Sequence, residues 1–235
     1  MVTKLTGIVK FEHMEIDIKN SLSHNRIGSY EQLKGMQNHG HALPLPLNTA
    51  LELYAWNGQV SSALLFPLHI CEVVLRNAAA EVLERVYGSN WPWNTTFERS
   101  LPNPAKGYSM QRDLQSARDR KTKQGQVIPE LKFAFWQNIF TSRFDGRLWT
   151  PHLASALPNS PAHLPTSDRR LSLYNNLEKI RRLRNRIAHH EPIFARNLRE
   201  DLDTIYEVTR WRCQTTAVWM DIHQTASDLI VKRPV

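Results

Sequence analysis

Apolar residues recur every three to four positions along most of this 235-residue chain. That spacing gathers them on one face of an α-helix, whereas a half-buried strand would alternate apolar and polar residues. The sequence holds no convincing set of alternating segments. The periodicity therefore predicts an all-α protein, and the chain is long enough for one or two domains with a sizeable core.

Turn and capping signals divide the chain into several expected helices. The first begins just after Ser29, because Ser29 and Gln32 have the spacing of a capping box. The second is the longest, and Pro67 is expected to kink or break it. Pro192 ends a later helix near Glu191, since proline disfavours helical geometry in the residue before it. The expected helices span residues 29–40, 48–88, 106–125, 130–141, 146–156, 167–191 and 197–226.

The chain is basic, with 30 lysines and arginines against 22 aspartates and glutamates and a formal net charge of +8. Such a balance favours an anionic partner such as a nucleic acid, bound through phosphate contacts and counterion release. Many basic proteins bind nothing specific, so charge alone does not decide between a nucleic-acid partner and none.

The two cysteines, Cys71 and Cys213, lie far apart without a CxxC neighbour. This argues against a disulfide framework and a cysteine zinc site, and predicts two small buried side chains. The longest apolar run, from Ala63 to Leu75, is shorter than a membrane span and contains Glu72. With no leader-like N-terminus and no C-terminal cysteine for prenylation, the chain is expected in the cytoplasm without a membrane contact.

Some histidines and tryptophans invite a functional interpretation that the sequence does not favour. His39 and His41 have metal-like spacing but no acidic or cysteine partner nearby, so we expect a loop there and no metal site. Five tryptophans are expected as core and interface anchors and not as platforms for nucleobases: Trp56, Trp91, Trp93, Trp136 and Trp149.

The stretch around Arg184 carries most of the chemical information. On a helix its apolar side chains fall within about 40° of a common direction and form a buried stripe of Leu173, Leu177, Ile180 and Ile187. Arg184 falls on the same stripe. Burying a guanidinium costs several kcal/mol unless it is paired, so we expect a partner for Arg184. An Arg184 that faces solvent, or histidines of paired subunits too far apart to serve a common pocket, would contradict the nuclease assignment.

Asn185 and His189 lie four residues apart and share a neighbouring face of this helix. Arg184 points about 140° away from His189, so one helix does not aim both side chains at a single phosphate without local distortion. Two copies of the helix packed across a dimer axis would form a shared site. The structural alternatives are a buried salt bridge for Arg184 and a favourable interaction of His189 with the helix dipole.

A second charged side chain is expected on an apolar face. In the helix that follows Leu68, Glu72 lies on the apolar stripe and Arg76 lies at its margin. The two have the spacing and the favourable order of a local ion pair. Alternatively, Glu72 reaches Arg184 between packed helices and fixes it in place. Glu72 and Arg76 are therefore candidates for a supporting or catalytic role.

The segment RNRIAHHEPIF resembles the Arg-x4–6-His signature of the HEPN superfamily, in the version of the Abi-like (abortive infection) proteins of bacteria. The segments SLSHNRIGSYEQL, LELYAWNGQVSSAL, EVVLRNA, SNW and LWTPHLASALP occur in the order which that family shows. The resemblance covers about residues 20–195. It implies a single HEPN-like helical bundle with peripheral helices at 21–235, preceded by an N-terminal extension at 1–20.

The resemblance further implies a metal-independent endoribonuclease of the toxin or antiphage type, with an active site where two such helices meet in a homodimer. In this interpretation His189 is the acid or base, and Arg184 stabilises charge on the phosphorane. Asn185 orients His189 or hydrogen-bonds the phosphate. His190 also fits the allowed spacing and is the rival of His189. No metal or other cofactor is implied.

Four more cations on the same helix are candidates for contacts with RNA phosphates, or else form a solvated basic face: Lys179, Arg181, Arg182 and Arg186. RNA is the expected partner, with a cognate antitoxin or a small non-coding RNA as a further one. Two other functions stay open. One is a non-catalytic module that holds a structured RNA, and the other is a structural dimer with a buried network of Arg184 and Glu72.

Overall fold

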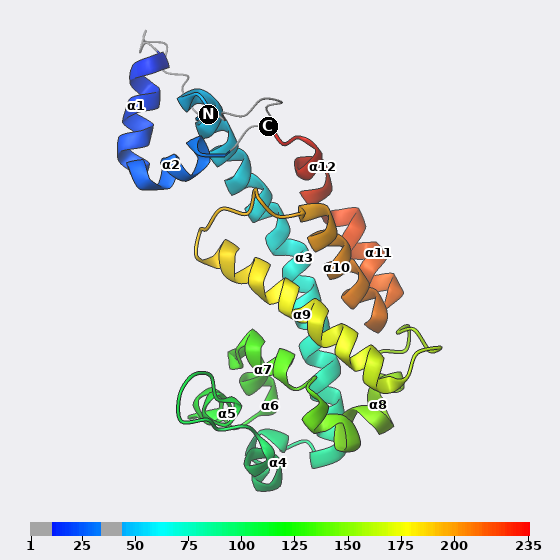
Figure 1. Cartoon of the computed structure of the whole chain (residues 1–235). Helices are drawn as coiled ribbons and strands as arrows, with labels where there is room; N and C mark the ends of the chain where they lie inside the picture. The colour runs from blue at the N-terminus through cyan, green and yellow to red at the C-terminus, as the bar shows by residue number, and fades with distance from the viewer. Residues whose placement is uncertain (1–10, 34–43) are drawn as a thin grey trace. The chain divides into compact units, whose positions relative to one another are not determined.

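The computed structural model of the protein describes residues 11–33 and 44–235, with side chains from residue 13 onward in the first range. The predicted loop with His39 and His41 lies outside these ranges. Every element within them is helical, which confirms the all-α class (Figure 1). The α-helices are α1 (Phe11–Leu22), α2 (His24–Glu31), α3 (Leu47–Tyr87), α4 (Thr95–Ser100), α5 (Met110–Arg118), α6 (Gln124–Val127), α7 (Phe133–Asn138), α8 (Thr150–Ala156), α9 (Thr166–Ala188), α10 (Leu198–Arg212), α11 (Gln214–His223) and α12 (Ala226–Val231). Three short 3₁₀ helices and one π-helix complete them: η1 (Trp91–Trp93), η2 (Ile128–Glu130), η3 (Ser142–Phe144) and the π-helix η4 (Asp145–Trp149).

The chain divides into two compact units. Unit 1 takes residues 1–62 and 226–235, and unit 2 takes residues 63–225. Helix α3 contributes its first part to unit 1 and its remainder to unit 2. The predicted HEPN-like domain at 21–235, with an extension at 1–20, stays a prediction.

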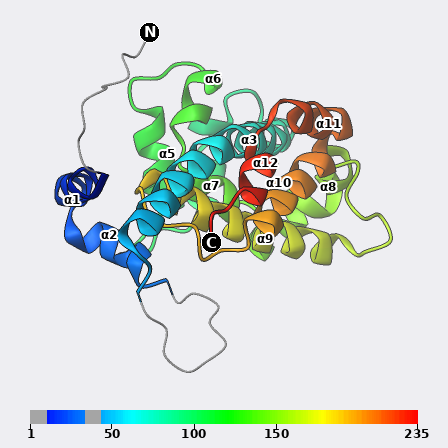
Figure 2. The same ribbon diagram turned by 90° about the horizontal axis from the view of Figure 1, so that it is seen from above.

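Helix α2 begins earlier than the sequence suggested. The chain bends between α1 and α2 at Ser23, whose φ is 79° (Figure 2). The Ser23 hydroxyl accepts a hydrogen bond from the Arg26 backbone N–H at 3.4 Å and caps the helix. Ser29 lies inside α2 and donates to the carbonyl of Asn25 at 3.2 Å. The prediction of a start after Ser29 is therefore wrong, because a serine inside a helix bonds back to the preceding turn.

Three contacts of aromatic side chains lie within unit 1. The Trp56 indole N–H donates to the carbonyl of Leu229 in α12 at 2.7 Å, and the Arg233 guanidinium lies 5.8 Å from the Trp56 ring centroid. Tyr30 of α2 packs edge-on against Tyr54 of α3, with 5.2 Å between ring centroids. Rings that bury their faces and hydrogen-bond their polar edges are typical core anchors.

Helix α3 runs without a break over 41 residues, close to the predicted range 48–88. Pro67 lies inside it and is buried. A proline within a helix removes one backbone hydrogen bond. Leu64 and Leu68 on either side of it are 4% exposed or less, so their packing holds the helix together across Pro67.

By length and composition, α3 is also long and apolar enough to cross a membrane, with a mean hydropathy of 1.4 over its best window. The core helix of a water-soluble protein passes the same test. Cys71 and Leu75 are 1% exposed or less, and Glu72 pairs with Arg76 on the same helix. A third of this window is buried, so α3 contributes one face to the core.

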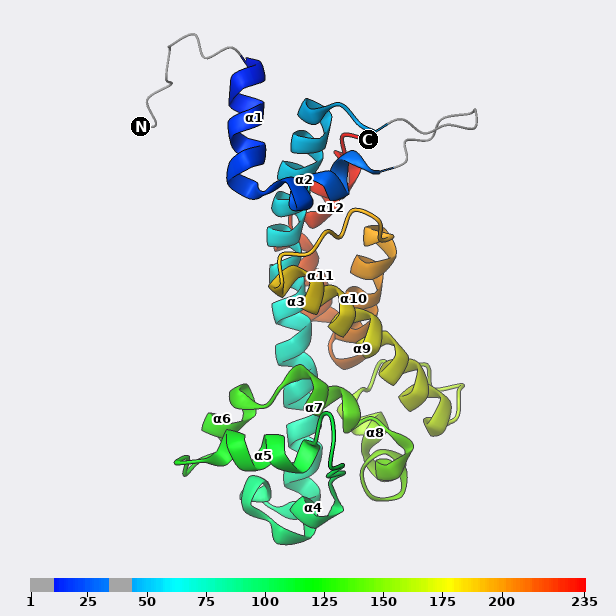
Figure 3. The ribbon, with the colours of Figure 1, turned by 60° about the vertical axis from the view of Figure 1, so that its left-hand side comes forward.

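Helices α4 to α7 belong to unit 2 (Figure 3). Aromatic side chains fill this part of the core. Trp91 packs edge-on against Trp136, with 6.3 Å between ring centroids, and Phe140 stacks on Trp149 at 4.2 Å. The core role predicted for tryptophans is confirmed for the four that are buried, Trp56, Trp91, Trp136 and Trp149, whereas Trp93 is half-buried.

Within unit 2, helix α9 packs against α7, α8 and α10. Asn176 of α9 donates to the Glu207 carboxylate of α10 at 3.0 Å, and Lys179 pairs with Glu200 at 2.9 Å. Because these contacts join the C-terminal half of α9 to α10, they fix which face of that half remains open.

The helix predicted at 197–226 is in fact two helices, α10 and α11, separated at Cys213. The Cys213 backbone is extended, and its sulfur accepts a hydrogen bond from the Thr216 N–H at 3.5 Å. Hydrogen bonds from the side chain and then the backbone of Thr216 lower the pKa of the Cys213 thiol. Cys213 is half-buried, so the predicted burial holds for Cys71 alone of the two cysteines. Burial raises the pKa of the Cys71 thiol to about 12.

Candidate functional site

The structure places Arg184 on the surface. Its side chain is exposed, so the prediction that it lies on the buried stripe of α9 is wrong. The buried residues of α9 are Arg170, Leu173, Leu177, Ile180, Leu183 and Ile187. Arg184 therefore needs no partner to offset a cost of burial. A nuclease assignment can no longer be based on a buried guanidinium.

The prediction fails because the buried face changes direction along α9. On an ideal helix Arg184 points only about 20° from Leu177, which is buried. Arg170 bonds to η4 and Glu178 bonds to α7 on one side of α9. Asn176 and Lys179 bond to α10 on another side, within about 40° of the direction of Leu183 on an ideal helix. The last buried residues of α9, Leu183 and Ile187, lie toward this α10 side. The side that carries Arg184 is left open.

Two of the predicted RNA-binding arginines form an acidic–basic cluster with Glu178. Arg181 and Arg182 pair with the Glu178 carboxylate at 2.9 and 2.7 Å, and Gln137 of α7 donates to it at 2.7 Å. Partial burial works to raise the pKa of Glu178, but the hydrogen bonds from Gln137, Arg182 and Arg181 outweigh it, and the pKa lies below its usual value. Much of the charge of these arginines is therefore offset within the chain.

Arg184 differs from the cations around it. Arg186 donates to the carbonyl of Pro192 at 2.7 Å and lies 3.5 Å from the Glu191 carboxylate. With Lys179 bound to α10 as well, each predicted RNA-binding cation on α9 has an acidic neighbour. The Arg184 guanidinium makes no hydrogen bond or ion pair with any residue that the structure describes. Its charge is available for an external anion.

The C-terminal end of α9 is closed by a histidine in a left-handed conformation. His189 caps the helix, and His190 has a φ of 55°. The His190 N–H donates to the Ile187 carbonyl at 3.0 Å, and the Glu191 N–H donates to the Arg186 carbonyl at 2.8 Å. This pair of bonds is a Schellman motif, in which glycine usually takes the left-handed position. A histidine there costs about 1 kcal/mol, and such local strain clusters at functional sites.

The predicted catalytic side chains share the end of α9 without contacting one another. His189 and His190 are exposed, and Asn185 is half-buried. Within the described residues, no hydrogen bond joins the side chains of Arg184, Asn185 and His189. An exposed guanidinium can bind a phosphate, and an exposed imidazole can transfer a proton. One chain alone does not bring these two groups to one point.

Glu72 does not reach Arg184. Its carboxylate lies 3.9 Å from the Arg76 guanidinium, one helical turn away on α3, and both side chains are half-buried. The local pair is confirmed, and the supporting contact between Glu72 and Arg184 is wrong. The structure therefore also contradicts the predicted buried network of Arg184 and Glu72.

Two pockets of unit 2 are lined by residues other than Arg184, Asn185 and His189. In residues 11–33 and 44–235, no three His, Cys, Asp or Glu side chains form a group that could hold a metal ion. A pocket of about 310 Å³ adjoins two of the predicted RNA-binding residues and is lined by Lys179, Arg182, Arg196, Asn197, Glu200 and Asp201. Its charges are paired internally, for example Arg196 with Asp201 at 2.6 Å. A second pocket, around Arg143 and Arg147, was not predicted from the sequence.

Comparison of the chain with protein-family models, with curated proteins and with solved structures gives no match.

Proposed function

We propose that the protein is an endoribonuclease that works without a metal ion, at a site formed where the C-terminal ends of α9 from two copies meet. The observation that supports this best is the exposed Arg184 guanidinium, which has no partner among the described residues. Exposed histidines follow it at the end of the same helix. The resemblance to Abi-like proteins of the HEPN superfamily supports the reaction class. The exposure of Arg184 contradicts the buried guanidinium that the sequence predicted, so burial gives the proposal no support.

A second copy is needed because Arg184 and His189 diverge in one chain, by about 140° on an ideal helix. In a homodimer whose two-fold axis passes beside Ala188, between the directions of Arg184 and His189 on an ideal helix, the guanidinium of one copy faces the imidazole of the other. Ala188 is exposed and lies one turn beyond Arg184 on the same face. Its small side chain leaves room for the partner helix to approach.

The chemistry needs only side chains that this end of α9 presents. An imidazole at His189 takes the proton of the RNA 2′-hydroxyl, whose oxygen then attacks the adjacent phosphorus. Arg184 holds two phosphate oxygens and stabilises the charge that develops on the phosphorane. The bond to the 5′ oxygen breaks, and a protonated imidazole at His190 supplies the leaving group with a proton. The products are a 2′,3′-cyclic phosphate and a 5′-hydroxyl.

The experiment is cleavage of total RNA by the purified protein in EDTA. The wild type is compared with Arg184→Ala, His189→Ala and His190→Ala. Loss of the guanidinium should slow cleavage by about 10²–10³-fold, and loss of the acid or base by about 10²–10⁴-fold. The matched control is Arg210→Ala, which removes an exposed arginine of α10 that is not a candidate site residue and should cleave as the wild type does.

Two results would overturn the proposal. Cleavage that EDTA abolishes would contradict a metal-independent mechanism. Cleavage that persists in all three variants would point to a contaminant or to a different site. A toxin or antiphage role in the cytoplasm is part of the proposal, and arrest of growth on expression of the wild type, but not of Arg184→Ala, is its first test.

The second candidate is a non-catalytic module that binds a structured RNA. It is favoured by the net charge of +8 and by the absence of hydrogen bonds among Arg184, Asn185 and His189 in the described structure. In that case the wild type shifts RNA in a gel but never cuts it. His189→Ala would then bind RNA as tightly as the wild type, whereas Arg184→Ala would bind it more weakly.

A further inference from the structure

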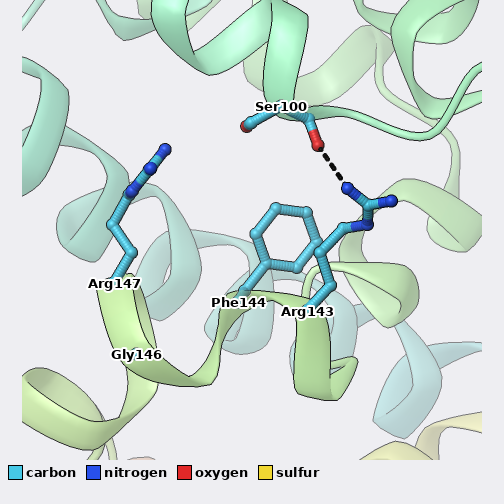
Figure 4. A pocket seen from close by; sticks show the side chains of 5 residues that line it. All are labelled: Ser100, Arg143, Phe144, Gly146 and Arg147. Carbon is cyan, nitrogen blue, oxygen red and sulfur yellow. Dashed lines mark hydrogen bonds between the residues drawn. The ribbon is translucent and has the colours of Figure 1, made fainter.

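A second basic site lies in unit 2, in a pocket of about 520 Å³ lined by Ser100, Arg143, Phe144, Gly146 and Arg147. Figure 4 shows the two arginine side chains on either side of the Phe144 ring, both extending toward Ser100. Arg143 belongs to η3, and Arg147 belongs to the π-helix η4. Short π-helical segments occur often at functional sites. None of these five residues belongs to the site proposed on α9.

The two guanidinium groups keep most of their hydrogen-bonding capacity. Arg143 donates to the Ser100 carbonyl at 3.3 Å, and Arg147 donates to the Tyr87 hydroxyl at 3.1 Å. Both acceptors are uncharged, and neither arginine forms an ion pair with a described residue. Each guanidinium has five N–H donors, so most of them face the pocket or solvent.

The carboxylates closest in the sequence are bound elsewhere. Asp145, between the two arginines, accepts two hydrogen bonds from the buried Arg170 of α9, at 2.9 and 3.0 Å. Glu98, two residues before Ser100, pairs with Arg118 at 2.7 Å and accepts from Gln115 at 2.6 Å. No acidic side chain lines the pocket. Its positive charge is therefore not offset inside the protein.

The lining also limits which anion fits. Two guanidinium groups that flank one space match the geometry of phosphate oxygens, which arginine binds in pairs. The Phe144 ring is 2% exposed, so it offers no face for a nucleobase to stack on. The Ser100 hydroxyl donates to the Phe97 carbonyl at 2.6 Å and is already used. The volume leaves room for a phosphate and for the group that carries it.

We propose that this pocket binds a phosphate group, clamped between Arg143 and Arg147 and recognised without contacts to a base. The proposal does not depend on the nuclease function of α9. The phosphate comes either from a small phosphorylated molecule or from the backbone of an RNA, and both present the same oxygens to the two arginines.

The test is isothermal titration calorimetry of the full chain with inorganic pyrophosphate at low salt. The double variant Arg143→Gln/Arg147→Gln should weaken binding at least about 10-fold, because two charge-assisted contacts are lost. The variant Arg143→Lys/Arg147→Lys keeps the charge but loses the forked geometry, and an intermediate loss is expected. The control Arg120→Gln/Arg210→Gln removes two exposed arginines outside the pocket and should bind as the wild type does.

Competition identifies the source of the phosphate. If adenosine monophosphate displaces pyrophosphate and a 2′-O-methylated RNA octamer does not, the ligand is a small phosphorylated molecule. If the octamer displaces pyrophosphate, the ligand is an RNA backbone. Circular dichroism verifies that the variants fold. The proposal is overturned if the wild type binds none of the three probes, or if the control loses as much affinity as the glutamine variant. RNA cleavage in EDTA by the glutamine variant separates this site from the one on α9.

Discussion

Replacing Asp145 by asparagine tests whether its ion pair with Arg170 anchors the π-helix η4 on α9. Arg170 is 7% exposed, and its Nε and Nη2 donate to the two carboxylate oxygens at 2.9 and 3.0 Å. Removing one partner of a buried ion pair costs about 3–5 kcal/mol, because the remaining charge stays desolvated. The Asp145 side chain is 27% exposed, so water relieves part of this cost. We expect a loss of about 2 kcal/mol.

Urea unfolding followed by circular dichroism measures this loss. The matched control is Glu130→Gln, which breaks an ion pair of 3.2 Å with Lys121 in which the side chains are 53% and 34% exposed. An exposed pair of this kind contributes less than about 1 kcal/mol. If Asp145→Asn lowers the free energy of unfolding no more than Glu130→Gln does, burial of Arg170 does not strengthen its pair with Asp145. That result would refute the expected loss.

Four further predictions concern burial, strain and capping. Leu183→Ala should lower the free energy of unfolding by about 3 kcal/mol, whereas Arg184→Ala should change it by less than about 0.5 kcal/mol. Urea unfolding measures both values, and equal losses would mean that Arg184 is buried. His190→Gly should raise the same quantity by about 1 kcal/mol, and a decrease would contradict a strained backbone. Ser23→Ala should lower it by about 1 kcal/mol, and an unchanged value would contradict the cap. Because burial raises the pKa of Cys71 from 9.0 to about 12, its contribution to stability is present below pH 9 and is lost as the pH rises toward 12. Cys71→Ala should flatten this alkaline decline, and an unchanged decline would argue against a buried neutral thiol.

Much of the fold follows from local patterns. The periodicity of apolar residues predicted α3 to within a residue at each end, and the tryptophans predicted as core anchors are mostly buried. The helix predicted from residue 197 is capped there, because the Asn197 side chain accepts a hydrogen bond from the Glu200 N–H at 3.2 Å. Such signals depend on a few neighbouring residues and do not need the tertiary structure.

The errors arise where tertiary contacts decide. Ser23 and Ser29 are both plausible caps by residue type, and only the bend after α1 selects Ser23. The placement of Arg184 assumed one buried direction along the whole of α9, whereas its packing partners change from η4 and α7 to α10. Likewise, Pro192 predicted an end near Glu191, but a left-handed His190 already ends α9 at Ala188.

The candidate sites also depend on tertiary contacts that local sequence patterns do not predict. The spacing of Arg184 and His189 is visible in the sequence, but the absence of a partner for Arg184 among the described residues is a property of the folded chain. The pocket at Arg143 and Arg147 gave no sequence signal, because its charge depends on the engagement of Asp145 by Arg170 in a distant helix.

Mixing two inactive variants tests the shared site most directly. If each site takes Arg184 from one copy and His189 from the other, an Arg184→Ala/His189→Ala heterodimer has one intact site. After exchange of subunits, half of the dimers are of this kind, and cleavage of RNA in EDTA should return to about a quarter of the wild-type rate. A mixture as inactive as its two components, beside a wild type that cleaves, would contradict a site shared between two copies.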